Sequence, residues 1–184
     1  MSDAALVLVV LAGLPGTGKS TLARILADEL AAPLFDKDRV REALFGPLHV
    51  RYTSEQDDFV MGLLYQAVEH EARVGSASHV ILDGRTFSRR EQEQALGQVV
   101  ARLGLSLRLI ECTCDPRVAR ERLRRSQELG LHPAADRGPE LYDRLAAGAH
   151  PLQLPKLVLD TAAEPPAALA SRALDYVLGA PPRR

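Results

Sequence analysis

The chain has 184 residues and a formal net charge of −1, and 46% of its residues are hydrophobic. That length fits one domain with a sizeable core. Because 23 basic side chains balance 24 acidic ones, the composition excludes a general attraction to nucleic acid or to an anionic membrane surface. Any bound anion must therefore be held by a local site.

The first half of the chain predicts strands that alternate with helices. We expect strands at residues 6–12, 33–35 and 79–83, and helices at 19–31, 39–45 and 53–74. The longest helix opens on a capping-box pattern from Thr53 to Gln56 and ends at Gly75.

The second half continues the alternation. We expect strands at 105–112 and 156–159, helices at 88–103, 116–129 and 166–178, a short helix after the loop 130–139, and a frayed tail at 180–184. Ser88 and Glu91 form a second capping box, and Asp115 with Pro116 starts the next helix. Five apolar strands separated by helices indicate an α/β domain, residues 1–184, with a central five-stranded parallel sheet covered on both faces.

The longest apolar run, residues 4–12, is too short to cross a bilayer. No basic residue precedes it and no small-residue cleavage site follows, so we expect a cytoplasmic protein. Cys112 and Cys114 lie two apart on a predicted strand, where an easy disulfide is disfavoured, and we expect reduced thiols.

A glycine-rich motif follows the first predicted strand. It matches the pattern G-x-x-x-x-G-K-[ST] and reads Gly13, Leu14, Pro15, Gly16, Thr17, Gly18, Lys19 and Ser20, followed by Thr21. Its glycines let successive backbone N–H groups turn toward a phosphate, and the next helix points its positive end to the same place. Lys19 can reach the β- and γ-phosphates, and Ser20 can offer a hydroxyl to Mg²⁺. We expect residues 13–21 to bind a nucleotide.

The strand 79–83 is apolar and ends in Asp83. An acid in this position, one strand–helix unit after a P-loop, is the Walker B pattern. We expect Asp83 to support the Mg²⁺ shell together with Ser20, directly or through water.

Asp38 and Arg41 follow the second predicted strand. With the motif at 13–21 and the strand ending at Asp83, this pair resembles the small P-loop kinases. That family includes polynucleotide 5′-hydroxyl kinases, gluconate kinases, adenylylsulfate kinases, chloramphenicol phosphotransferases and zeta-type toxins. The resemblance implies a three-layer P-loop NTPase fold and ATP with Mg²⁺ as cofactors. It also implies transfer of the γ-phosphate to a hydroxyl of a small acceptor.

By position in this family, Asp38 is the candidate general base and Arg41 holds an acceptor anion or the phosphoryl group in flight. Residues three apart on a first helical turn face the same way. The alternative is a solvated helix start, in which Asp is a common cap. Asp36 is left as either a cap or a second acid of the metal shell.

Five arginines lie between 117 and 125, and the resemblance implies an arginine-rich lid at about 116–148. Relatives carry an arginine where this chain has Ser126, so Arg125 or Arg122 is the candidate catalytic arginine, with Arg137 a further candidate. The alternative is that Glu121, Glu128 and these arginines pair on a solvated face.

Tyr52, Asp57 and the helix 55–74 are expected to wall the acceptor pocket. Arg85 faces either this pocket or an exposed turn, and Thr161 is a candidate neighbour of adenine.

Two further functions remain open. One is an ATP-hydrolysing switch without an acceptor, although we find no glutamine or glutamate placed to position water. The other is a polynucleotide 5′-hydroxyl kinase, which the balanced charge disfavours. We expect no membrane partner and either a monomer or a dimer.

Overall fold

The computed structural model describes residues 5–51, 53–129 and 138–179. The strands are β1 (Val7–Ala12), β2 (Leu34–Asp36), β3 (His79–Asp83), β4 (Ser106–Thr113) and β5 (Leu157–Asp160). The helices are α1 (Lys19–Leu30), α2 (Lys37–Phe45), α3 (Ser54–Val74), α4 (Arg90–Leu103), α5 (Pro116–Glu128), α6 (Pro139–Ala147) and α7 (Pro166–Val177). No helix in the described ranges is both long and apolar enough to cross a membrane.

The five strands form one parallel sheet in the order β2-β3-β1-β4-β5. β1 lies at the centre, where Val7 is in register with His79 of β3 and Ser106 of β4. A central parallel strand is buried on both faces, which explains why β1 is apolar at every position. The predicted five-stranded parallel sheet is confirmed.

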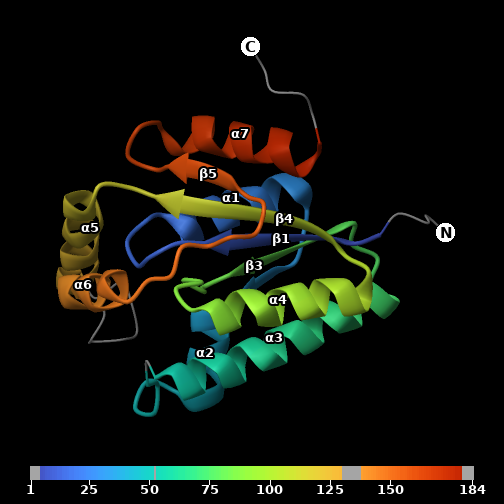
Figure 1. Cartoon of the computed structure of the whole chain (residues 1–184), viewed down its shortest axis with the longest axis horizontal. Coiled ribbons are helices and arrows are strands. Elements are labelled where there is room, and N and C mark those ends of the chain that lie inside the picture. Colours follow the sequence, from blue (N-terminus) through green and yellow to red (C-terminus); the bar gives the residue numbers. More distant parts are fainter. Residues whose placement is uncertain (1–4, 52, 130–137, 180–184) are drawn as a thin grey trace.

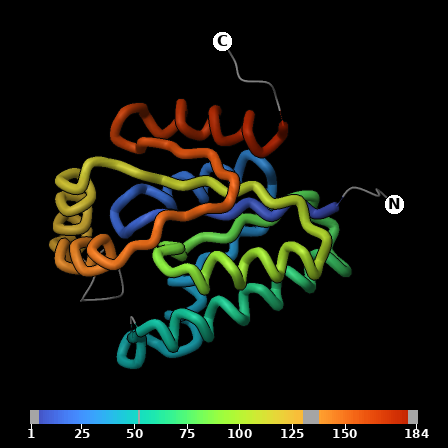
Figure 2. The backbone as a smooth tube through the Cα atoms, viewed as in Figure 1, coloured from blue at the N-terminus to red at the C-terminus, as the bar shows by residue number. Residues whose placement is uncertain are grey.

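Helices cover both faces of the sheet (Figure 1). Alternate residues of β1 enter separate cores. Leu8 and Val10 pack in the core beneath α3 and α4, whereas Val9 and Leu11 pack in the core beneath α1 and α7. The predicted three-layer arrangement is therefore confirmed, and Figure 2 shows the same layers as a continuous backbone.

Helices α5 and α6 stand beyond the end of the sheet to which the arrowhead of β4 points (Figure 1). They share a small apolar cluster of Ala119, Leu123 and Tyr142, against which Leu14 also packs. The carboxyl ends of parallel strands meet at this edge, so the segments that follow β1, β2 and β3 lie at the same end of the sheet as these two helices.

Two helices begin two residues away from the expected position. α2 starts at Lys37 because the Asp36 carboxylate accepts the backbone N–H groups of Asp38 and Arg39, at 3.0 and 3.3 Å. α4 starts only at Arg90, so the capping box predicted at Ser88 is wrong. The Ser88 hydroxyl instead contacts the Thr86 hydroxyl at 3.0 Å within the loop.

Candidate active site

The loop after β1 depends on its glycines. Gly13, Gly16 and Gly18 all have positive φ. A Cβ at Gly13 would lie 2.2 Å from the Cys112 carbonyl oxygen, and one at Gly16 would lie 2.5 Å from the carbonyl oxygen of Ala119 in α5. Real Cβ atoms do not approach this closely, so the loop can pass between β4 and α5 only with glycine at these positions.

Lys19 and the start of α1 complete the predicted phosphate-binding loop. The Lys19 side chain is buried, and its Nζ donates to the Leu14 carbonyl at 2.7 Å, as the Thr17 hydroxyl also does. No side chain caps the start of α1 at Gly18. The first N–H groups of a helix lack intrahelical partners, so this end suits an anion.

Asp83 lies at the carboxyl end of β3 and is almost completely buried. Neither carboxylate oxygen has a hydrogen-bond partner of good geometry among the described residues. Burial raises the pKa of Asp83, and the nearby Ser20 hydroxyl and Lys19 ammonium oppose this shift. The Ser20 hydroxyl is nevertheless not placed to form a hydrogen bond of good geometry with either Asp83 oxygen. Two buried oxygens without donors beside a serine hydroxyl fit a hard divalent cation such as Mg²⁺.

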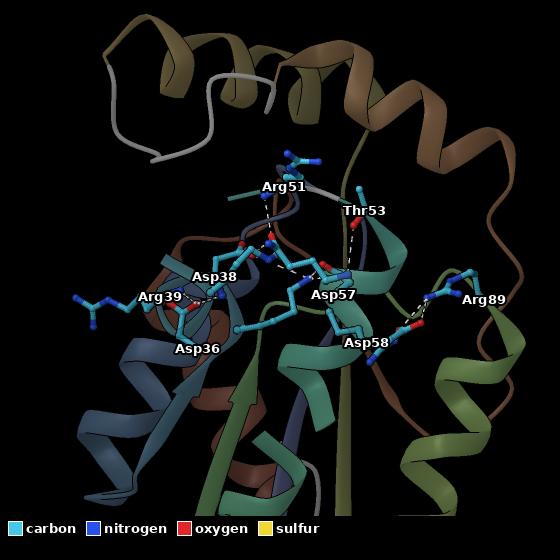
Figure 3. A network of polar contacts seen from close by, with 12 residues as sticks. Asp36, Asp38, Arg39, Arg51, Thr53, Asp57, Asp58 and Arg89 are labelled. Carbon is cyan, nitrogen blue, oxygen red and sulfur yellow. Dashed lines mark hydrogen bonds and ion pairs between the residues drawn. The ribbon is translucent and has the colours of Figure 1, made fainter. Parts of the chain in front are cut away.

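Arg41 of α2 joins two aspartates, Asp38 and Asp57, which are labelled in Figure 3. Its side chain is fully buried; Nη1 donates to Asp38 Oδ1 at 3.2 Å, and Nη2 donates to Asp57. Lys37 Nζ donates to both Asp57 oxygens at 2.8 Å and lies 4.0 Å from Asp38. Burial lowers the pKa of Lys37, which the carboxylates of Asp38 and Asp57 oppose.

Asp58 follows Asp57 on α3 and forms ion pairs with the segment between β3 and α4. It accepts from Arg85, and from Arg89 at 2.9 Å. Arg85 is buried, so it does not occupy an exposed turn, and it is not among the residues that line the cleft. Neighbouring aspartates of α3 therefore tie α2 on one side and the β3–α4 loop on the other. The sequence offered no signal for these partners, because they come from distant segments.

A cleft of about 680 Å³ lies at this edge of the sheet. Its described lining includes Lys19 and Ser20 of the phosphate loop, and Asp38 and Asp57 from the α2 and α3 side. Hydroxyl groups and an amide also reach it, together with three arginines: Thr53, Ser54, Thr86, Ser88, Gln92, Arg51, Arg89 and Arg144. The nucleotide motif and the predicted base thus share one space. Asp57 lines the predicted acceptor side, and Tyr52 lies outside the described residues.

A smaller cavity of about 210 Å³ lies beside the phosphate loop, against α1, α5 and α7. Arg122 lines it and donates to the Thr161 hydroxyl and carbonyl, both at 2.9 Å, and to the Gly16 carbonyl at 3.4 Å. The Thr161 hydroxyl donates in turn to Thr17 at 2.9 Å. Arg122 therefore ties α5 to the phosphate loop and to the end of β5.

The other arginines of α5 differ from Arg122. Arg117 pairs with Asp115, Arg120 pairs with Asp143, and Arg124 pairs with Glu121 and Glu128; the solvated-face interpretation holds for these three arginines. Arg125 is exposed and lines neither cavity described above. The lid and the catalytic arginine stay predictions, and Arg137 lies outside the described residues.

No curated protein matches the chain. Among solved structures, a candidate kinase from Chloroflexus aurantiacus is 22% identical with a TM-score of 0.74, covering 94% of this chain and 98% of that one. An APS kinase from Mycobacterium tuberculosis, solved with AMPPNP and APS, is 18% identical with a TM-score of 0.68, covering 96% and 99%. A gluconokinase from Sinorhizobium meliloti is 15% identical with a TM-score of 0.67, covering 97% and 94%.

These likenesses extend over nearly the full length of each chain and show a shared fold. The sequence evidence comes from a family model, described as an AAA domain, which matches residues 8–137. That span runs from β1 through the phosphate loop and Asp83 to the end of α5 and on to residue 137. The chain therefore belongs to the AAA domain family and has the fold of the small P-loop kinases.

Proposed function

We propose that the chain is an ATP-dependent phosphotransferase that moves the γ-phosphate to a hydroxyl group of a small-molecule acceptor, with Mg²⁺ as cofactor. The observation that carries this proposal is the shared cleft, which contains Lys19 and Ser20 together with Asp38. A hydrolase needs the phosphate side and a residue that positions water. A carboxylate across the cleft from a phosphate loop supports an acceptor with a proton to lose.

On the phosphate side, Lys19 and the N–H groups of residues 13–21 bind the nucleotide phosphates, with the glycines keeping the backbone close to them. Ser20 and Asp83 hold Mg²⁺, which when bound neutralises charge on the phosphates. Arg122 and Thr161 place the adenine base of ATP beside the phosphate loop, since they line the small cavity next to Gly18. Arg125 lines neither cavity, so it would stabilise charge during transfer only after closure of the lid predicted at about 116–148.

On the acceptor side, Asp38 orients the hydroxyl and accepts its proton. Arg41 is completely buried and absent from the cleft lining, so we assign it to positioning rather than to contact with the acceptor. Its bonds to Asp38 and Asp57 fix the Asp38 carboxylate. Catalysis then depends on geometry and charge placement, as expected for phosphoryl transfer.

The first test is ATP turnover with Mg²⁺ across a panel of hydroxyl compounds, with phosphorylated products identified by mass spectrometry. Wild type is compared with Lys19→Ala and Asp38→Asn. We expect a product from one acceptor class, no product with Lys19→Ala, and slower transfer but unchanged nucleotide binding with Asp38→Asn. ATP hydrolysis at one rate with every compound, unaffected by Asp38→Asn, would replace the proposal with an ATP-hydrolysing switch.

A further inference from the structure

The acceptor side of the cleft carries more positive than negative charge. Of the described residues that line the cleft, five are cationic and only Asp38 and Asp57 are acidic. Lys19 belongs to the phosphate loop, which leaves Lys37 and three arginines for the acceptor side. Asp57 already bonds to Lys37 and Arg41, so its charge is matched within the protein. The excess therefore lies with the arginines.

These three arginines come from separate segments. Arg51 precedes α3, Arg89 is the N-cap of α4, and Arg144 lies on α6. Arg89 bonds to Asp58, which also neutralises the buried Arg85. Within ranges 5–51, 53–129 and 138–179, neither Arg51 nor Arg144 has an ion-pair partner. Figure 3 shows Arg51 above Asp57, on the side of the polar network that faces α5 and α6.

Arg41 cannot supply this positive charge to a ligand. It is fully buried, and its charge is matched by Asp38 and Asp57. The exposed guanidinium groups at the cleft are those that a ligand can reach, and guanidinium pairs strongly with carboxylate and phosphate oxygens.

We propose that the acceptor is a small hydroxylated anion whose carboxylate or phosphate group binds Arg51 and Arg144, with Arg89 adding positive charge. This inference rests on the proposed phosphotransfer and names the substrate class of the same site. The side chains of Thr53, Ser54, Thr86, Ser88 and Gln92 line the cleft and suit the remaining hydroxyl groups of such a compound. Arg51 and Arg144 determine specificity, whereas Asp38 acts on the reacting hydroxyl.

The test measures binding apart from transfer. The protein is saturated with AMPPNP and Mg²⁺ so that the phosphate loop is occupied, and isothermal titration compares gluconate with glucose and glycerol 3-phosphate with glycerol. At least one anion should bind about tenfold or more tightly than its neutral partner, because hydrogen bonds between charged groups are stronger than those between neutral groups. Arg51→Gln and Arg144→Gln should each remove most of that preference without changing AMPPNP affinity.

The control is Arg172→Gln, which removes an arginine paired with Glu164 near α7, away from the cleft lining. It should keep the full anion preference. Equal binding of anions and neutral partners would overturn the inference, as would an anion preference that survives both cleft variants. Loss of AMPPNP affinity in those variants would place the arginines on the nucleotide instead.

Transfer is followed in the same samples with ATP in place of AMPPNP. If neutral sugars are phosphorylated as fast as their anionic partners, the proposed function stands and the inference fails. If no acceptor is phosphorylated but the arginine-dependent anion preference remains, the anion site stands and the phosphotransfer proposal fails.

Discussion

Arg41 bridges Asp38 and Asp57, donating to the first from Nη1 at 3.2 Å and to the second from Nη2, while its own side chain is fully buried. Arg41 thereby fixes the carboxylate of the candidate general base, Asp38, by linking it to Asp57 on α3. Asp57 also accepts from Lys37, so one carboxylate of α3 contacts two buried cations of α2.

Removing Asp57 should destabilise the protein strongly. Asp57→Asn leaves the buried charges of Lys37 and Arg41 partly unmatched, and losing one partner of a buried ion pair costs about 3–5 kcal/mol. Urea unfolding at neutral pH measures the change. Glu69→Gln is the matched control, because Glu69 also lies on α3 and pairs with two arginines, but these are exposed. Equal losses in both variants would contradict the role assigned to burial.

Arg41 should affect the chemical step through Asp38. Arg41→Lys keeps a positive charge but cannot bridge two carboxylates with a planar fork, so kcat should fall by roughly tenfold or more with little change in the KM for ATP. Arg41→Met should lose more activity than Arg41→Lys. A rise in the KM of the acceptor at unchanged kcat would instead indicate that Arg41 touches the acceptor.

The phosphate loop should not tolerate a methyl group at Gly16. Gly16→Ala forces a Cβ toward the Ala119 carbonyl at a φ of 78°, and such strain costs roughly 1–3 kcal/mol. ATP affinity should fall as well. Gly97→Ala is the control: this helical glycine has open space where a Cβ would stand, so the variant should gain roughly 0.5–1 kcal/mol of stability.

Asp83 should make stability depend on pH and on Mg²⁺. Because burial raises its pKa above the ordinary 3.8, its stabilising contribution is full below 3.8 and is lost as pH rises through the folded value. At neutral pH, Asp83→Asn should therefore raise the unfolding temperature of the nucleotide-free protein, and this gain should disappear near pH 4. The variant should also lose the extra stabilisation that Mg²⁺ adds to ATP. An unchanged Mg²⁺ effect would remove Asp83 from the metal site.

Arg122 should matter for nucleotide binding more than its neighbours on α5. Arg122→Ala removes three hydrogen bonds that join α5 to Gly16 and Thr161, so ATP affinity should fall by about tenfold. Arg124→Ala removes only exposed pairs with Glu121 and Glu128 and should leave affinity unchanged. Equilibrium titration with a fluorescent ATP analogue compares the two variants. Similar losses would show that the tie to Thr161 is irrelevant to the nucleotide.

Local patterns in the sequence were enough to predict the sheet and the glycine-rich turn after β1. Apolar runs predicted every strand to within one or two residues, because a parallel sheet buried on both faces demands them. Contacts between distant segments could not be predicted in this way. Asp57 and Asp58 bind cations of α2 and of the loop after β3, and Arg85, a partner of Asp58, is buried. Ser88 failed as a cap because its hydroxyl contacts Thr86.

The central claim is that Asp38 directs the γ-phosphate to a hydroxyl rather than to water. The most direct test measures ADP, phosphorylated acceptor and free phosphate together in single-turnover reactions of wild type and Asp38→Asn. In wild type we expect ADP and phosphorylated acceptor to form in equal amounts with little free phosphate, and Asp38→Asn should slow transfer by about 100-fold or more. Equal amounts of ADP and free phosphate with every acceptor, at the same rate in both proteins, would contradict the claim.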